Sequence, residues 1–137
     1  MSLGLYLHIP YCFSKCRYCD FYSAPGQRGV PRAYVDALLR ELSRFAPDAP
    51  LRPNTLYFGG GTPSLLDPAD AARLIDAAQP LPGAEITLEA NPETVTEDSL
   101  RAFREAGVNR ISFGVQSARD SQLKTLGRPH TAKQARA

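Results

Sequence analysis

Short apolar runs alternate with stretches of helical spacing along the 137 residues, and this alternation restricts the fold more than any other feature. The runs that fit strands are 5–9, 55–58, 85–89 and 110–115. A stretch that fits a helix follows each run, and strands alternating with helices of about a dozen residues predict a parallel sheet built from right-handed crossovers. The sequence therefore predicts an α/β fold of about four parallel strand–helix units.

The expected helices begin and end at recognisable signals. Pro31 opens the first, Asp67 and Pro68 cap and open the second, and Thr96 caps a third that Gly107 ends. A short fourth helix is expected around Asp120, Leu123 and Leu126. Apolar residues at helical spacing predict which side of each helix faces the core. These residues are, for the first helix, Tyr34, Leu38, Leu42 and Phe45; for the second, Ala71, Leu74, Ile75 and Ala78; and for the third, Leu100, Phe103 and Ala106.

The charge balance excludes several classes of function. Sixteen Lys and Arg residues face 14 Asp and Glu residues, and a net charge of +2 provides no basic field for nucleic acid or a membrane surface. No apolar run is long enough to span a bilayer, and the first residues do not resemble a secretion signal. The odd number of cysteines, 3, argues against a secreted disulfide scaffold, so we expect a cytoplasmic protein.

All three cysteines, Cys12, Cys16 and Cys19, lie in one Cys-x3-Cys-x2-Cys segment after the first strand. Structural zinc needs four ligands, usually from two separated pairs, whereas three thiolates can hold a [4Fe–4S] cluster with one iron open to a small chelating ligand. His8 could supply a fourth ligand, but a residue within the strand is badly placed to join the loop. Zinc and inert buried thiols remain the alternatives at this point.

Polar or side-chain-free residues follow all four strands, at the edge where parallel sheets bind ligands. The cysteine loop follows the first strand, Gly59-Gly60-Gly61-Thr62 the second, and Gln116 the fourth, while Glu89 ends the third. The glycines allow close backbone approach to a ligand, but they also fit an ordinary turn and lack the phosphate-loop pattern. Glu89, Gln116 and Arg128 could likewise be solvated charges or polar groups.

Four segments in order resemble the radical S-adenosylmethionine (SAM) proteins. They are YLHIPYCFSKCRYCDF at 6–21, GGGTPS at 59–64, LEANPE at 88–93 and GVNRISFGVQS at 107–117. More narrowly, they resemble the group that contains oxygen-independent coproporphyrinogen III oxidases and HemW-type heme chaperones. The resemblance implies a partial (βα)6 barrel like a TIM barrel, of which residues 1–137 would be an N-terminal part of the radical SAM core domain, truncated before the C-terminal strands.

The resemblance also implies a cofactor site. Three irons of a [4Fe–4S] cluster would be bound by Cys12, Cys16 and Cys19, and SAM would chelate the fourth iron. The family's SAM contacts and the aromatic position of the cluster loop map onto Tyr6, at the end of the first strand, and onto Tyr18, Gly60, Gly61, Thr62, Glu89, Gln116 and Arg128. In radical SAM enzymes an electron from the cluster cleaves SAM, and the resulting radical abstracts a hydrogen atom.

Phe21 separates the two branches of the group. The oxidases carry a further cysteine two residues after the third, whereas Cys-Asp-Phe resembles the heme chaperones, which carry heme as cargo. The implied partners are heme or porphyrin, heme-accepting respiratory proteins with a membrane-associated partner, and an electron donor, with no nucleic acid. A coproporphyrinogen oxidase and an inactive truncated remnant are the alternatives.

Overall fold

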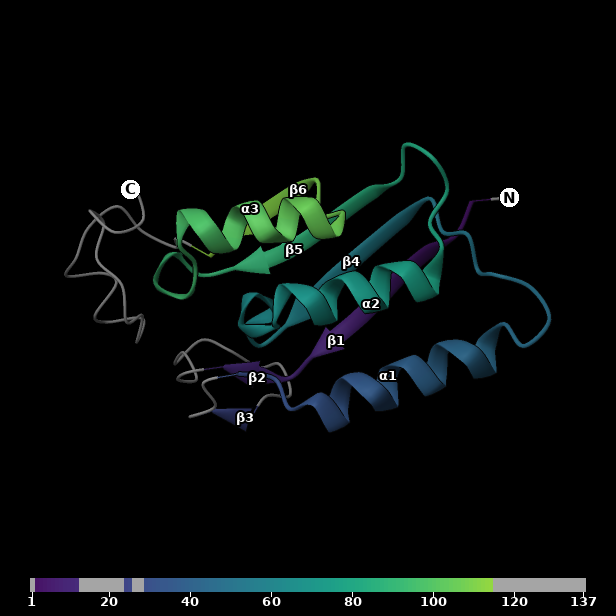
Figure 1. The fold of residues 1–137 in the computed structure, drawn as a ribbon, viewed down its shortest axis with the longest axis horizontal. Helices are drawn as coiled ribbons and strands as arrows, with labels where there is room; N and C mark the ends of the chain where they lie inside the picture. Colours follow the sequence, from purple (N-terminus) through teal and green to yellow (C-terminus); the bar gives the residue numbers. More distant parts are fainter. Residues whose placement is uncertain (1, 13–23, 26–28, 115–137) are drawn as a thin grey trace.

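The computed structural model describes residues 2–12, 24–25 and 29–114, and these form a parallel sheet covered by helices (Figure 1). The sheet has the strand order β1-β4-β5-β6, and all of its neighbouring strands are parallel. Its strands are β1 (Gly4–Ile9), β4 (Thr55–Gly60), β5 (Glu85–Ala90) and β6 (Arg110–Phe113). The helices between them are α1 (Arg32–Phe45), α2 (Pro68–Ala78) and α3 (Glu97–Ala106). The predicted α/β fold with parallel strand–helix units is confirmed.

Short elements sit at the carboxyl ends of the strands. The two-residue strands β2 (Tyr11–Cys12) and β3 (Ala24–Pro25) pair in parallel, and single 3-10 turns η1 (Pro63–Leu65) and η2 (Pro92–Thr94) follow β4 and β5. The η1 turn lies against both β2 and β5. The segment that leads into the cysteines is therefore in contact with the segment that follows the glycines.

Capping groups explain where two helices begin. The Asp67 side chain accepts a hydrogen bond from the Ala69 backbone N–H at 2.9 Å, which caps α2. Thr96 and Ser99 form a reciprocal capping box at the start of α3, and Gly107 ends that helix with φ of 121°. The expected fourth helix lies outside the described residues.

The hydrophobic core lies between the sheet and the three helices, which cover one face of the sheet (Figure 1). Its centre contains Leu56 and Phe58 of β4, Leu88 of β5 and Phe103 of α3, and burial of each such side chain contributes about 1.5–3 kcal/mol to folding. The predicted inner face of α2 is confirmed, since all four of its residues are buried, namely Ala71, Leu74, Ile75 and Ala78.

The predicted inner face of α1 is partly wrong. Leu42 is buried and Leu38 is packed against the core, but Phe45 is 75% exposed. Val35, in the first turn of α1 and outside the predicted face, is fully buried. Phe45 is the last residue of α1, and its exposure shows that the core ends before the helix does. Helical spacing identifies a stripe but cannot show how far along the helix the core extends.

Two strand boundaries also differ from expectation. Gly59 and Gly60, expected in the loop after the second strand, belong to β4 because they pair with His8 and Ile9 of β1. Tyr6, expected at the end of the first strand, is the third residue of β1. Both differences arise because β1 and β4 run side by side for six residue pairs.

None of the helices in the described part of the chain combines the length and apolar character that a membrane crossing requires.

Candidate functional site

A polar cluster occupies the sheet face opposite the helices. Successive residues of a strand point to opposite faces of the sheet. Leu56 and Phe58 of β4 and Leu88 of β5 are buried on the helix side. Their chain neighbours Tyr57 and Glu89 therefore lie on the other face. Tyr6 of β1 is the register partner of Tyr57, and the two rings stack with centroids 5.9 Å apart and an interplanar angle of 14°. Three neighbouring strands therefore contribute one side chain each to the cluster.

The Glu89 carboxylate is held at both oxygens by β4. The Tyr57 hydroxyl donates to Oε2 at 2.7 Å, and the Gly60 backbone N–H donates to Oε1 at 3.1 Å. An ionised carboxylate has about four acceptor positions, so each oxygen can accept a further bond. Glu89 is thus oriented by the protein and still able to bind an ammonium or hydroxyl donor.

Burial and the Glu89 charge raise the pKa of both tyrosines. Burial and, after it, the hydrogen bond to the Glu89 carboxylate together raise the pKa of Tyr57 to about 12. The pKa of Tyr6 is also raised, first by burial and then by the negative charge of Glu89. A phenol is protonated at neutral pH in any case, and the raised pKa extends the protonated state of both tyrosines to more alkaline pH.

The glycine segment is bound to the segment that leads into the cysteines. Gly61 donates its backbone N–H to the Ile9 carbonyl at 2.8 Å, and Thr62 donates to the Tyr11 carbonyl at 2.7 Å. A Cβ on Gly60, where φ is 118°, would lie 2.7 Å from the Ile9 oxygen, and one on Gly61 would lie 2.7 Å from the Tyr11 oxygen. The close contact between the segment 60–61 and the segment 9–11 therefore requires both glycines, whatever role they have with a ligand.

Thr62 contributes mainly through its backbone. Its side chain is 2% exposed, and its hydroxyl accepts a hydrogen bond from Asn91 Nδ2 at 3.2 Å. Asn91 follows β5 and Thr62 follows β4, so this bond connects the segments at the carboxyl ends of the two strands. The N–H groups of Gly60, Gly61 and Thr62 are thus all bonded within the chain, and the group that the arrangement presents in a fixed orientation is the Glu89 carboxylate.

Five of the predicted site residues, Tyr6, Gly60, Gly61, Thr62 and Glu89, come together at or next to this cluster. Cys12 is the second residue of β2 and follows Tyr11 directly. The remaining predicted residues lie outside the described residues; they are Cys16, Cys19, Tyr18, Gln116 and Arg128. Within the described ranges, no group of three His, Cys, Asp or Glu side chains could hold a metal ion.

Sequence reasoning missed Tyr57, which joins the cluster through its ring and its hydroxyl. A signal for it exists, because Tyr57 alternates with the apolar residues Leu56 and Phe58 and lies two residues before Gly59. The sequence suggests His8 only as a possible metal ligand; in the structure its Nδ1 lies 3.2 Å from the Tyr6 hydroxyl.

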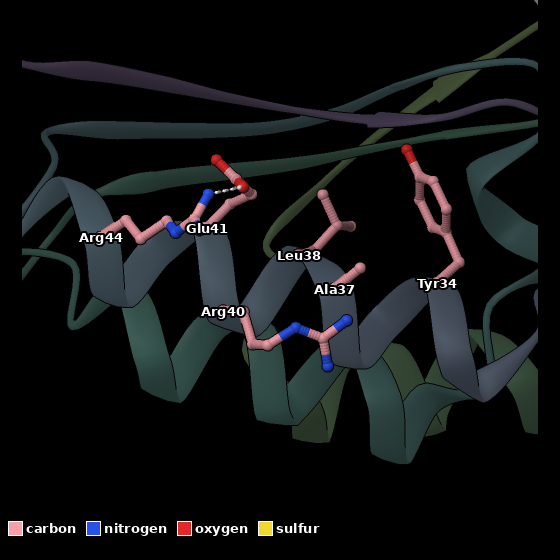
Figure 2. A pocket seen from close by; sticks show the side chains of 6 residues that line it. All are labelled: Tyr34, Ala37, Leu38, Arg40, Glu41 and Arg44. Atoms are coloured by element: carbon pink, nitrogen blue, oxygen red, sulfur yellow. Dashed lines mark hydrogen bonds and ion pairs between the residues drawn. The ribbon is translucent and has the colours of Figure 1, made fainter.

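A hollow of about 380 Å³ on α1 is separate from this cluster (Figure 2). All of its lining comes from one helix, and Glu41 and Arg44 form an ion pair at 3.3 Å on one side. The lining residues are Tyr34, Ala37, Leu38, Arg40, Glu41 and Arg44. Because neither Glu89 nor its partners belong to it, we assign this hollow no part in the site.

Comparison with known proteins places the chain in a family. The Radical SAM superfamily matches residues 6–137. The chain is 46% identical to the heme chaperone HemW of Escherichia coli strain K12, over 98% of this chain and 37% of that protein. It is 41% identical to the mitochondrial radical S-adenosyl methionine domain-containing protein 1 of Bos taurus, over 96% of this chain and 31% of that protein.

A solved structure gives the same result. The coproporphyrinogen III oxidase HemN from Escherichia coli, described as a radical SAM enzyme, superposes with a TM-score of 0.85 and 31% identity. That match covers 98% of this chain and 32% of the oxidase, so the chain spans about a third of the length of the proteins it resembles. The resemblance inferred from the sequence is confirmed, and the chain belongs to the radical SAM superfamily, in the group that includes HemW and HemN.

Proposed function

We propose that the full-length protein is a HemW-like heme chaperone of the cytoplasm that binds a [4Fe–4S] cluster and SAM and delivers heme to respiratory proteins. Residues 1–137 would form the amino-terminal part of its radical SAM core domain. The observation that carries the proposal is the Glu89 carboxylate, held by Tyr57 and the Gly60 N–H at the end of the sheet from which the cysteine segment departs.

The residues of the chain suit the cofactors. Three thiolates, from Cys12, Cys16 and Cys19, match a cluster with one iron left open, and the family implies such a cluster and SAM. When bound, the cluster supplies an electron to SAM, which requires an electron donor as a partner. Glu89 would accept hydrogen bonds from SAM, the Gly60–Thr62 segment would line its methionine end, and Gln116 and Arg128 would complete the contacts.

Two observations favour the chaperone over the oxidase. Phe21 stands where the oxidases carry a further cysteine, and the HemW proteins of Escherichia coli and Mycobacterium tuberculosis are 46% and 41% identical to this chain. The named cargo of these relatives is heme, so heme-accepting respiratory proteins, including membrane-associated ones, are the proposed partners.

The cluster is tested by anaerobic reconstitution of the full-length protein. We expect about four irons per chain and broad visible absorption. Cys16→Ser should lose iron, whereas Ser14→Ala, in the same segment, should retain it. Full iron content in Cys16→Ser, or a preparation that binds only zinc, would exclude the proposed ligation.

Heme delivery is tested separately. Heme-loaded protein is mixed with an apo respiratory hemoprotein, and transfer is followed by the acceptor's absorption spectrum. Transfer without turnover of coproporphyrinogen supports the chaperone. The structural similarity to HemN favours the oxidase as the second candidate, and formation of protoporphyrinogen from coproporphyrinogen with SAM and a reductant would establish it instead.

A further inference from the structure

We propose that Tyr57 is a positioning residue for SAM, which orients the Glu89 carboxylate through its hydroxyl and supports Tyr6 through its ring. The inference rests on the proposed function, because Glu89 and Tyr6 are the groups proposed to contact SAM. Tyr57 itself is not among the residues that the resemblance assigns to the cofactor.

The hydrogen bonds define the role of the hydroxyl. Glu89 receives one donor per oxygen, from two residues of the same strand, at 2.7 Å from Tyr57 and 3.1 Å from Gly60. The terminal torsion of a glutamate side chain is soft, so a carboxylate with one donor can rotate, whereas two donors on different oxygens set its plane. Without the Tyr57 hydroxyl, only the hydrogen bond from Gly60 would hold the plane of the Glu89 carboxylate.

The ring contacts define a second role. The Tyr6 ring stacks on the Tyr57 ring and also lies over Gly59, where an added Cβ would be 2.7 Å from Tyr6 Cε2. Tyr6 is 53% exposed, so its outer side is open while its inner side rests on β4. Tyr57 and Gly59 together therefore form the support on which Tyr6 lies.

The chemistry of the phenol suits a positioning role. Its pKa of about 12 keeps Tyr57 neutral at physiological pH, so it donates to Glu89 without cancelling the carboxylate charge. A lysine or arginine in its place would also orient the carboxylate but would neutralise it beside a cationic sulfonium ligand. The arrangement keeps one oriented negative charge at the site.

The test measures SAM affinity of the anaerobically reconstituted full-length protein by equilibrium dialysis. Tyr57→Phe keeps the ring and removes the hydroxyl, and we expect the Kd for SAM to rise about tenfold, as for loss of a hydrogen bond to a charged group. Tyr57→Leu should weaken binding further because Tyr6 loses its support. Glu85→Gln is the control, because Glu85 lies on β5 like Glu89, on the same face but four residues earlier, and this variant should bind SAM as the wild type does.

A double-mutant cycle separates orientation of Glu89 from a general structural effect. If Tyr57 acts through the carboxylate, adding Tyr57→Phe to Glu89→Gln should change the Kd by less than about twofold. Full additivity of the two changes, or unaltered SAM affinity in Tyr57→Phe, overturns the inference. Failure of the cluster-loaded wild type to bind SAM overturns the proposed function itself, and this outcome is distinct from the other two.

Discussion

The hydroxyl of Tyr34 on α1 donates a hydrogen bond of 2.5 Å to the backbone carbonyl of His8 on β1. The bond joins the first turn of α1 to the strand four residues before Cys12, and the Tyr11 ring packs edge-on against Tyr34 with centroids 5.4 Å apart at 81°. A helix that follows the cysteine segment in the chain thus holds the strand that precedes it.

Removal of the hydrogen bond from Tyr34 to His8 should destabilise the strand that leads into the cysteine segment. We expect Tyr34→Phe to lower the free energy of unfolding by about 1 kcal/mol and to accelerate iron loss from the reconstituted full-length protein. Chemical denaturation and the rate of iron release to a chelator measure the two effects. Ser43→Ala removes an exposed hydroxyl that bonds Leu39 within the same helix and should alter neither; equal effects from both variants would contradict this account.

Gly60 should not tolerate a side chain. Gly60→Ala places a Cβ 2.7 Å from the Ile9 carbonyl at a φ of 118°, and we expect a loss of at least about 2 kcal/mol in unfolding free energy. Gly83→Ala is the matched control, because Gly83 also has a positive φ, of 80°, but nothing lies within 4 Å of the added atom. Its cost should be about 1 kcal/mol, and a cost as large as that of Gly60→Ala would show that crowding is unimportant.

An ion pair network joins α1 to α2. Arg73 donates to Asp36 on α1 at 2.8 Å and to Asp70 on its own helix at 3.1 Å, and the Asp70 side chain is only 6% exposed. The two carboxylates raise the pKa of Arg73.

Removal of Arg73 should cost more than removal of a surface ion pair. We expect Arg73→Ala to lower the unfolding free energy more than Arg101→Ala does, because the buried Asp70 carboxylate loses its nearer partner and keeps, among the described residues, only Arg32, at 3.6 Å. Arg101→Ala breaks the exposed pair with Glu97 and should cost less than about 1 kcal/mol. Denaturant titration of both variants measures the two losses of unfolding free energy. A larger loss in Arg101→Ala than in Arg73→Ala would refute the prediction.

The raised pKa of Tyr57 predicts an alkaline transition. The folded protein releases this proton near pH 12 and the unfolded chain near pH 10, so the stabilising contribution is complete below pH 10 and is lost as the pH rises toward 12. Stability measured across this interval should fall more steeply in the wild type than in Tyr57→Phe. Glu89→Gln removes the charged acceptor, so the phenol absorption change of Tyr57 should move to lower pH. Parallel curves for the wild type and Tyr57→Phe would contradict the assignment.

The outer edge of β6 should make the isolated 137-residue chain prone to association. Among the described residues, β6 pairs only with β5, and Phe113 on it is 44% exposed, so its free edge and apolar surface can pair with another copy. We expect Phe113→Lys to reduce self-association measured by sedimentation velocity. Phe45→Lys, which changes an equally apolar residue at the end of α1, should reduce it less. A cooperative, monomeric melt of the unmodified 137 residues would refute this prediction.

The order of the elements and the family can be predicted from the sequence. Local chemistry suffices for this, because Asp67, Thr96 and Gly107 act on their own helix ends, and the strand–helix alternation is a pattern of near neighbours. The cysteine spacing and the GGGTPS and LEANPE segments likewise lie in short stretches that can be identified without a fold.

The residues that surround Glu89, and the need for the glycines, become visible in the folded chain. The bonds from Tyr57 and Gly60 to Glu89 join residues 32 and 29 positions apart. The close approach of Gly61 to Tyr11 likewise brings the segment after β4 next to β2. Such contacts depend on the register of β1, β4 and β5, which no local pattern specifies. The exposure of Phe45 has the same origin, since the extent of a core is set by packing between elements and not by the periodicity of one helix.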